Sequence, residues 1–183
     1  MSLQLIAPPS AEPVSLPDMK LYLRIDGTTY DTLLTALLGA ARDYAQRRQR
    51  RAYLTQTWEL TLDAFPPMPI ELPYSPLATV SSIKYVDSAG AETTVSSSNY
   101  VVDTSSTPGR VALKSDYSWP GVTLREVGGF KLRYTCGAST AALVPETTLL
   151  AIKGFVAHRF ENPEDASVPE WVNILLDLHK VVT

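Results

Sequence analysis

Hydrophobic and polar residues follow a helical period at both ends of the chain and a strand period in the middle. A capping sequence begins at Ser15, and the apolar residues after it predict a short helix over residues 16–25. A second start at Thr28 opens the longest periodic stretch, which predicts the principal helix. Its expected buried stripe consists of Leu33, Leu37, Ala40, Ala41 and Tyr44, flanked by Leu34 and Leu38.

Strict alternation of apolar and polar residues replaces the helical period beyond residue 55. Turn-forming residues at 87–90 and 106–109 join neighbouring segments and predict two hairpins. A loop over residues 115–129 is expected at the surface, where Trp119 is either an interface anchor or a cover for the core. The predicted strands are residues 58–62, 80–86, 92–95, 100–102, 111–113 and 130–136.

The helical period returns after Pro145, with an apolar stripe that runs to Phe160, and a last short helix is expected from Pro169. Neither helical pair carries enough apolar surface to form a core alone. The sequence therefore predicts an α+β fold with one helical core from residues 15–51 and 145–179. An antiparallel β region over residues 55–136 is inserted into it, within a single domain over residues 15–183, and residues 1–14 form an extended N-terminal arm.

Five of the fourteen prolines lie in the segment FPPMPIELPYSP, residues 65–76. Proline fixes φ and removes a backbone donor, so the segment can be neither a helix nor a normal strand. We interpret it as a rigid bridge that holds the β region at a fixed angle to the helical core.

Net charge argues against a dedicated nucleic-acid-binding protein, because the formal charge is −3 and the isoelectric point is about 5.4. Five of the sixteen basic residues are nevertheless clustered toward the end of the principal helix. A solvated helix end and a phosphate-binding surface are both consistent with this cluster. The segment includes Arg47, Arg48, Arg50 and Arg51.

Motifs for metal or nucleotide chemistry are missing, since His158 and His179 are the only histidines and Cys136 is the only cysteine. We therefore expect no catalytic residues, no metal and no cofactor. Cys136 and His158 leave open a thiol-dependent enzyme, although Cys136 continues the apolar alternation of its strand. A second alternative is a monomeric protein-binding β module. The sequence has no membrane-spanning run and no signal peptide, which favours the cytosol.

Several segments in order resemble the head-tail connector, or adaptor, proteins of long-tailed phages and prophages. The resemblance is carried by EPVSL to LRID near the N-terminus, QTWELTLDAFP, PLATVSSIKYVDSAG and VPETTLLAIKGFVAHRFENPED. It implies a structural virion protein that forms a ring beneath the portal protein, continues the DNA channel and docks the next head-completion or tail protein.

The same resemblance implies partners and a location. The partners are the portal protein, a downstream head-completion or tail protein, other copies of the chain, and DNA that passes transiently and without sequence specificity. The isolated protein can remain monomeric, because such rings often close only on the portal. The location is the head-tail junction of the virion, and the cytoplasm of the bacterial host before assembly. The candidate DNA-channel or subunit-interface residues are Arg47, Arg48, Arg50 and Arg51, with Trp119 as a further interface candidate.

Overall fold

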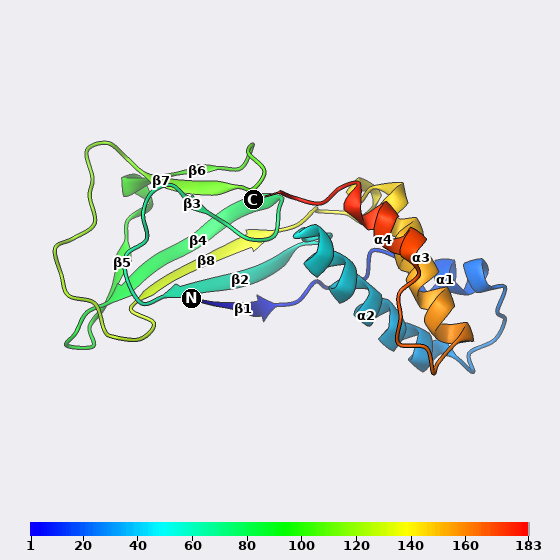
Figure 1. Cartoon of the computed structure of the whole chain (residues 1–183). Coiled ribbons are helices and arrows are strands. Elements are labelled where there is room, and N and C mark those ends of the chain that lie inside the picture. The colour runs from blue at the N-terminus through cyan, green and yellow to red at the C-terminus, as the bar shows by residue number, and fades with distance from the viewer. Residues whose placement is uncertain (183) are drawn as a thin grey trace. The chain divides into compact units, whose positions relative to one another are not determined.

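The computed structural model describes residues 1–182, which form two compact units (Figure 1). The sheet unit consists of Met1–Pro8 and Thr55–Gly137, and the helical unit consists of Pro9–Leu54 and the residues from Ala138 onward. The chain passes between the units after residues 8, 54 and 137. Helices and antiparallel sheets are thus segregated, which confirms the α+β class.

Four α-helices from the two ends of the chain make up the helical unit: α1 (Leu16–Leu23), α2 (Asp31–Gln49), α3 (Glu146–Glu161) and α4 (Glu170–Asp177). A short 3-10 turn, Ala141–Leu143, precedes α3. Helix α3 contacts each of the other three helices, and a single cluster of buried residues joins all four. The first and last parts of the sequence therefore share one core.

Helix starts agree with the sequence in one case and differ in another. The Ser15 hydroxyl oxygen accepts a hydrogen bond from the Asp18 backbone N–H at 3.2 Å, as expected for a capping sequence. Helix α2 begins at Asp31 with Tyr30 as its N-cap, so the predicted capping residue Thr28 lies two residues too early. Thr28 instead accepts a turn hydrogen bond from the Asp31 N–H through its carbonyl.

The predicted buried stripe of α2 is partly correct, because Ala41 lies in the core and Leu37 and Tyr44 pack against it, but its centre is displaced toward the flanking Leu34 and Leu38. Leu33 is 49% exposed, Ala40 is also exposed, and Leu37 is only half-buried. Apolar residues occupy two neighbouring faces of this helix, and packing against α3 decides which face turns inward. The residues of α2 in the hydrophobic core are Leu34, Leu38, Ala41 and Ala45.

The sheet unit contains two antiparallel sheets. The larger sheet has the strand order β1-β2-β8-β4-β5 and the smaller has the order β3-β7-β6. Both predicted hairpins are confirmed, since β4 pairs with β5 and β6 pairs with β7. The strands are β1 (Ser2–Ala7), β2 (Gln56–Leu62), β3 (Ile70–Glu71), β4 (Leu77–Val86), β5 (Glu92–Val95), β6 (Tyr100–Asp103), β7 (Arg110–Leu113) and β8 (Phe130–Cys136), with a 3-10 turn at Ser97–Asn99.

Strand β1 lies within the segment that was expected to be an N-terminal arm. It is extended, and it forms one edge of the larger sheet, antiparallel to β2, with Leu3 opposite Leu60 and Leu5 opposite Trp58. These residues are therefore ordered by pairing with β2 of the same chain.

The interpretation of residues 65–76 as a bridge between the helical and β regions is wrong. Both ends of the segment lie inside the sheet unit. Between its prolines, Ile70–Glu71 forms β3, an edge strand that pairs with β7. An edge position suits this proline-rich context, because an edge strand needs ladder donors on one side only.

Candidate functional site

The arginine cluster lies where α2 ends. Arg47 and Arg48 occupy the last turn of the helix, where positive charge is favourable near the C-terminal carbonyl groups. Arg50 caps the helix in the left-handed region, with φ 54°, and its N–H donates to the Gln46 carbonyl. This backbone turn sends consecutive arginine side chains to different parts of the surface.

Two of the four arginines form hydrogen bonds within the helical unit. Arg48 Nη2 donates to Asp177 Oδ2 at 2.6 Å, and Arg51 Nε donates to the His179 carbonyl at 2.7 Å. The hydrogen bond to Asp177 raises the pKa of the Arg48 guanidinium. These contacts tie the end of α2 to the end of α4.

The other two arginines, Arg47 and Arg50, are exposed. For Arg47, the structure gives no ion pair with any residue in the range 1–182. The four arginines of the predicted cluster therefore differ in exposure: Arg48 and Arg51 are partly buried, and Arg47 and Arg50 are exposed.

A buried polar group that the sequence analysis missed fixes the last turn of α2. The side chain of Gln49 is fully buried, and its amide nitrogen donates to Thr148 Oγ1 at 3.1 Å and to the Leu176 carbonyl at 2.7 Å. Its amide oxygen accepts from the Tyr53 hydroxyl at 2.8 Å. A buried amide with three satisfied bonds specifies one arrangement of α2, α3 and α4. Glutamine within a basic polar sequence gives no hydrophobic signal, so periodicity could not find it.

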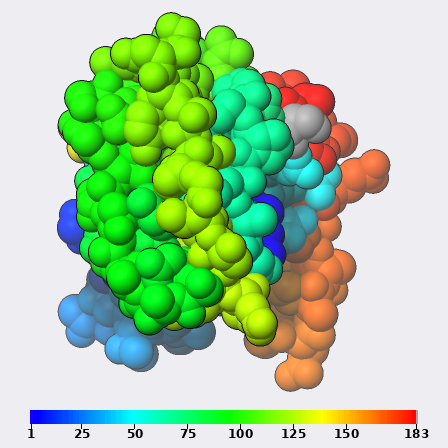
Figure 2. All heavy atoms as spheres, turned by 90° about the vertical axis from the view of Figure 1, so that its left-hand side faces the viewer, coloured from blue at the N-terminus to red at the C-terminus, as the bar shows by residue number. Residues whose placement is uncertain are grey.

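Trp119 belongs to the surface loop predicted between β7 and β8, which Figure 2 shows as a yellow-green band over the sheet unit. Its ring stacks on Phe65 at 4.9 Å between centroids and meets Phe130 edge-on at 5.5 Å. Its Nε1 donates to the Pro66 carbonyl at 3.0 Å. Trp119 is half-buried by these contacts, so part of the ring remains available to a partner.

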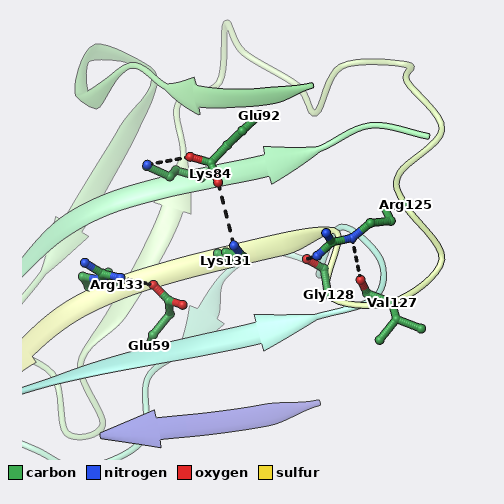
Figure 3. A network of polar contacts seen from close by, with 8 residues as sticks. All are labelled: Glu59, Lys84, Glu92, Arg125, Val127, Gly128, Lys131 and Arg133. Carbon is green, nitrogen blue, oxygen red and sulfur yellow. Dashed lines mark hydrogen bonds and ion pairs between the residues drawn. The ribbon is translucent and has the colours of Figure 1, made fainter. Parts of the chain in front are cut away.

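One face of the larger sheet carries a band of charged side chains (Figure 3). Glu92 pairs with Lys84 at 2.7 Å and lies 3.8 Å from Lys131, while Arg133 pairs with Glu59 at 2.7 Å. The hydrogen bond from Lys84 is the main reason that the pKa of Glu92 is lowered. These pairs are exposed and contribute little to stability individually. They form a mixed-charge surface on a face that strand alternation turns away from the core.

The arrangement expected of a thiol enzyme is not supported. Cys136 is fully buried, and burial raises the pKa of its thiol to about 12. His158 belongs to the other unit, where its Nε2 lies 3.1 Å from Asp165 Oδ2. Within residues 1–182, no three His, Cys, Asp or Glu side chains are grouped as a metal site would need. None of the helices described in this part of the chain has the length and apolar character to span a membrane.

Comparison with known proteins gives a family and a fold. The family described as phage gp6-like head-tail connector protein matches residues 13–109. Among curated proteins, none matches the chain significantly.

Several solved structures share the fold over the whole chain. A chain in the neck of an empty gene transfer agent particle, with C6 symmetry, has a TM-score of 0.83 at 21% identity. A chain in the virion of the native particle has a TM-score of 0.81 at 22% identity, and a chain in its neck with C12 symmetry has 0.78 at 22%. Each match covers 100% of this chain and 97% of the other.

Proposed function

The chain belongs to the phage gp6-like head-tail connector family, and from this premise we propose that its copies form a ring beneath the portal protein. The family match, which spans more than half of the 183 residues, is the observation that carries the proposal. The shared fold with neck chains in structures of sixfold and twelvefold symmetry supports a cyclic assembly.

In this proposal the ring continues the DNA channel of the portal and offers its other side to a head-completion or tail protein. The protein acts in the virion at the head-tail junction and resides in the host cytoplasm before assembly. Its role is structural and involves no catalysis, and the burial of Cys136 supports this part of the proposal. Trp119, which keeps part of its ring exposed, is a candidate for contact with a neighbouring protein.

Within the arginine cluster, we assign the contact with DNA phosphate, or with carboxylates of a neighbouring copy, to Arg47 and Arg50. Both side chains are exposed at the surface, where a partner can reach them. A ring multiplies each exposed charge by the number of its subunits, so two outward arginines per copy suffice for a positive collar.

Deletion of the gene from a strain that produces the parent particle tests the proposed function. We expect DNA-filled heads and separate tails, with few joined particles, when the products are counted by electron microscopy. A plasmid copy of the gene should restore joined particles. Normal numbers of tailed, DNA-filled particles after deletion would refute the connector role.

The role of the outward arginines is tested by complementation with an Arg47→Gln, Arg50→Gln variant. We expect fewer DNA-filled, tailed particles at an unchanged melting temperature, because exposed charges contribute little to folding. The matched Arg47→Lys, Arg50→Lys variant keeps the charge and should keep most of the yield. Normal yield with the glutamine variant would show that these charges have no part in assembly.

A further inference from the structure

Strand β1 is held in the sheet unit mainly by its backbone. Five of its six residues are exposed, and Leu3 is only half-buried. The apolar side chains of Leu5 and Ile6 keep 39% and 38% of their surface exposed. The ladder with β2 is itself irregular between Leu5 and Ala7. Little side-chain packing is therefore lost when β1 separates from β2.

The chain connects β1 to the helical unit before it reaches the strand that pairs with β1. Residues 1–8 belong to the sheet unit, and the chain enters the helical unit at Pro9. It returns to the sheet unit only at Thr55, directly before β2. No hairpin turn joins the two strands, so their ladder alone keeps them together.

The four residues that follow the strand, Pro8–Ala11, have the properties of a hinge. All except Pro9 are exposed. The two prolines have no N–H, so rotation there breaks no bond of a backbone donor. Within residues 1–182, the structure gives no backbone hydrogen bond to the other two. The helical unit holds the chain from Glu12 onward, because the Glu12 carboxylate accepts from Arg42 Nη1 at 2.5 Å.

We propose that β1 is an exchangeable strand, which pairs with β2 of a second copy while the β1 of another copy takes its place. Every copy carries the same β2 edge, so the exchanged strand finds the same register and the same backbone partners. Exchange of an identical element costs little free energy, because the bonds broken within a chain form again between chains.

The share of exchanged strands follows from the protein concentration. The same bonds form in both cases, so the ratio of exchanged to unexchanged strands equals the protein concentration divided by the effective concentration of a chain's own strand. A short tether gives an effective concentration on the order of 1 mM. Exchange is therefore minor in dilute solution and substantial where copies lie side by side. Only one step rests on the proposed function: in a ring, each copy gives its strand to one neighbour and receives one from the other.

Cross-linking of two residues that face each other in the ladder tests the exchange. Ser2 lies opposite Thr61, which brings their Cα atoms within the distance of about 7 Å that a disulfide requires. Ser2→Cys and Thr61→Cys variants are purified separately, mixed at about 1 mM protein and oxidised. Neither chain carries both cysteines of the pair, so a mixed disulfide forms only between copies. The native Cys136 is buried and does not interfere.

A control mixture separates strand exchange from random collision. In it, Thr94→Cys, at an exposed position on β5, replaces Thr61→Cys. We expect mixed dimers of Ser2→Cys with Thr61→Cys to form at least tenfold faster than with Thr94→Cys.

A shorter hinge gives a second test that needs no cysteine. Deletion of Ser10 and Ala11 removes up to about 7 Å of reach, which strains pairing within a chain but not between chains. We expect the mean mass, measured by light scattering after size exclusion, to be at least twice that of the parent protein at equal concentration. The Ser10→Gly, Ala11→Gly variant keeps the hinge length and should keep the mass of the parent.

Two results would overturn the inference. Mixed dimers that form no faster with Thr61→Cys than with Thr94→Cys would show that β1 stays with its own β2. A shortened variant with the mass of the parent would show that the strand does not pair between copies. Neither measurement depends on particle assembly, so strand exchange together with normal particles after gene deletion would refute the connector role alone.

Discussion

At the residue scale, Cys136 lies at the end of β8 with none of its surface exposed, and burial raises the pKa of its thiol from 9.0 to about 12. Only the thiolate reacts rapidly with alkylating reagents. At pH 8 the buried thiol is therefore almost entirely protonated.

We expect native protein to react with iodoacetamide at pH 8 at least a hundredfold more slowly than protein unfolded in guanidinium chloride. Both the low thiolate fraction and the burial of the sulfur act in this direction. Mass spectrometry over time measures the labelling. Rapid labelling of the native protein would contradict the buried site and would revive the thiol-enzyme alternative.

A second residue-scale feature is the contact between α3 and α4 at Gly154. A methyl group built on Gly154 would lie 1.9 Å from Cη2 of Trp171, so the indole occupies the space that a side chain would need. The glycine therefore allows close packing of the two helices.

Gly154→Ala should destabilise the helical unit by about 1–2 kcal/mol, because overpacking outweighs the better helix propensity of alanine. Urea unfolding followed by circular dichroism at 222 nm measures the change. Trp171→Ala removes the obstructing ring, so in that background Gly154→Ala should be neutral or stabilising. Equal destabilisation in both backgrounds would show that the indole is not the cause.

At the element scale, packing against the other helices decides which face of α2 is buried, and the hydrophobic pattern of α2 alone does not. Leu38 is 2% exposed and belongs to the core, whereas Leu33 is 49% exposed on the same helix. The two leucines have the same chemistry, so they make a matched pair.

We expect Leu38→Ala to cost about 3 kcal/mol in free energy of unfolding, because it leaves a cavity in the core. Leu33→Ala should change the free energy by about 0.5 kcal/mol or less. Urea denaturation of both variants makes the comparison, and similar costs for the two would mean that the inward face of α2 is misassigned.

The elements that the sequence predicted well are those with a long, clear period. All four α-helices and both hairpins in the described part of the chain were found, because helical periodicity, strand alternation and turn residues are local signals. Strand β1 was missed, since the prolines that follow it dominated the interpretation of residues 1–14. The inward face of α2 and the buried Gln49 depend on α3 and α4, which lie about a hundred residues away in sequence. For the candidate site, the arginines were found from the sequence, but the bonds of Arg48 to Asp177 and of Arg51 to His179 join residues about 130 positions apart and could not be predicted.

At the scale of the whole molecule, the chain builds two units from interleaved segments. Residues 1–8 belong to the sheet unit, although the residues that follow them belong to the helical unit. Truncation at the N-terminus therefore affects the sheet unit, whose other residues begin only at Thr55.

Deletion of residues 1–8 should remove the edge strand and weaken β2 without unfolding the helices. We expect amide exchange in β2 to become at least tenfold faster, while amides of α2 and α3 keep their protection. Hydrogen exchange with mass spectrometry measures both units in one experiment. Unchanged exchange in β2 would mean that β1 does not pair in solution, and lost protection in α3 would mean that the units do not open separately.

The bridge between Leu54 and Ala138 brings together the two points at which the inserted segment leaves and re-enters the helical unit. Residues 55–137 are encoded by one continuous gene segment, and the residues on either side of it are paired in the fold. Recombination between related genes can therefore exchange this segment, here called the cassette, without interrupting a helix. Strand β1 is encoded outside that cassette. An exchanged β region would thus arrive without its matching edge strand, and we expect productive recombinants to carry the first eight codons from the same parent as the cassette.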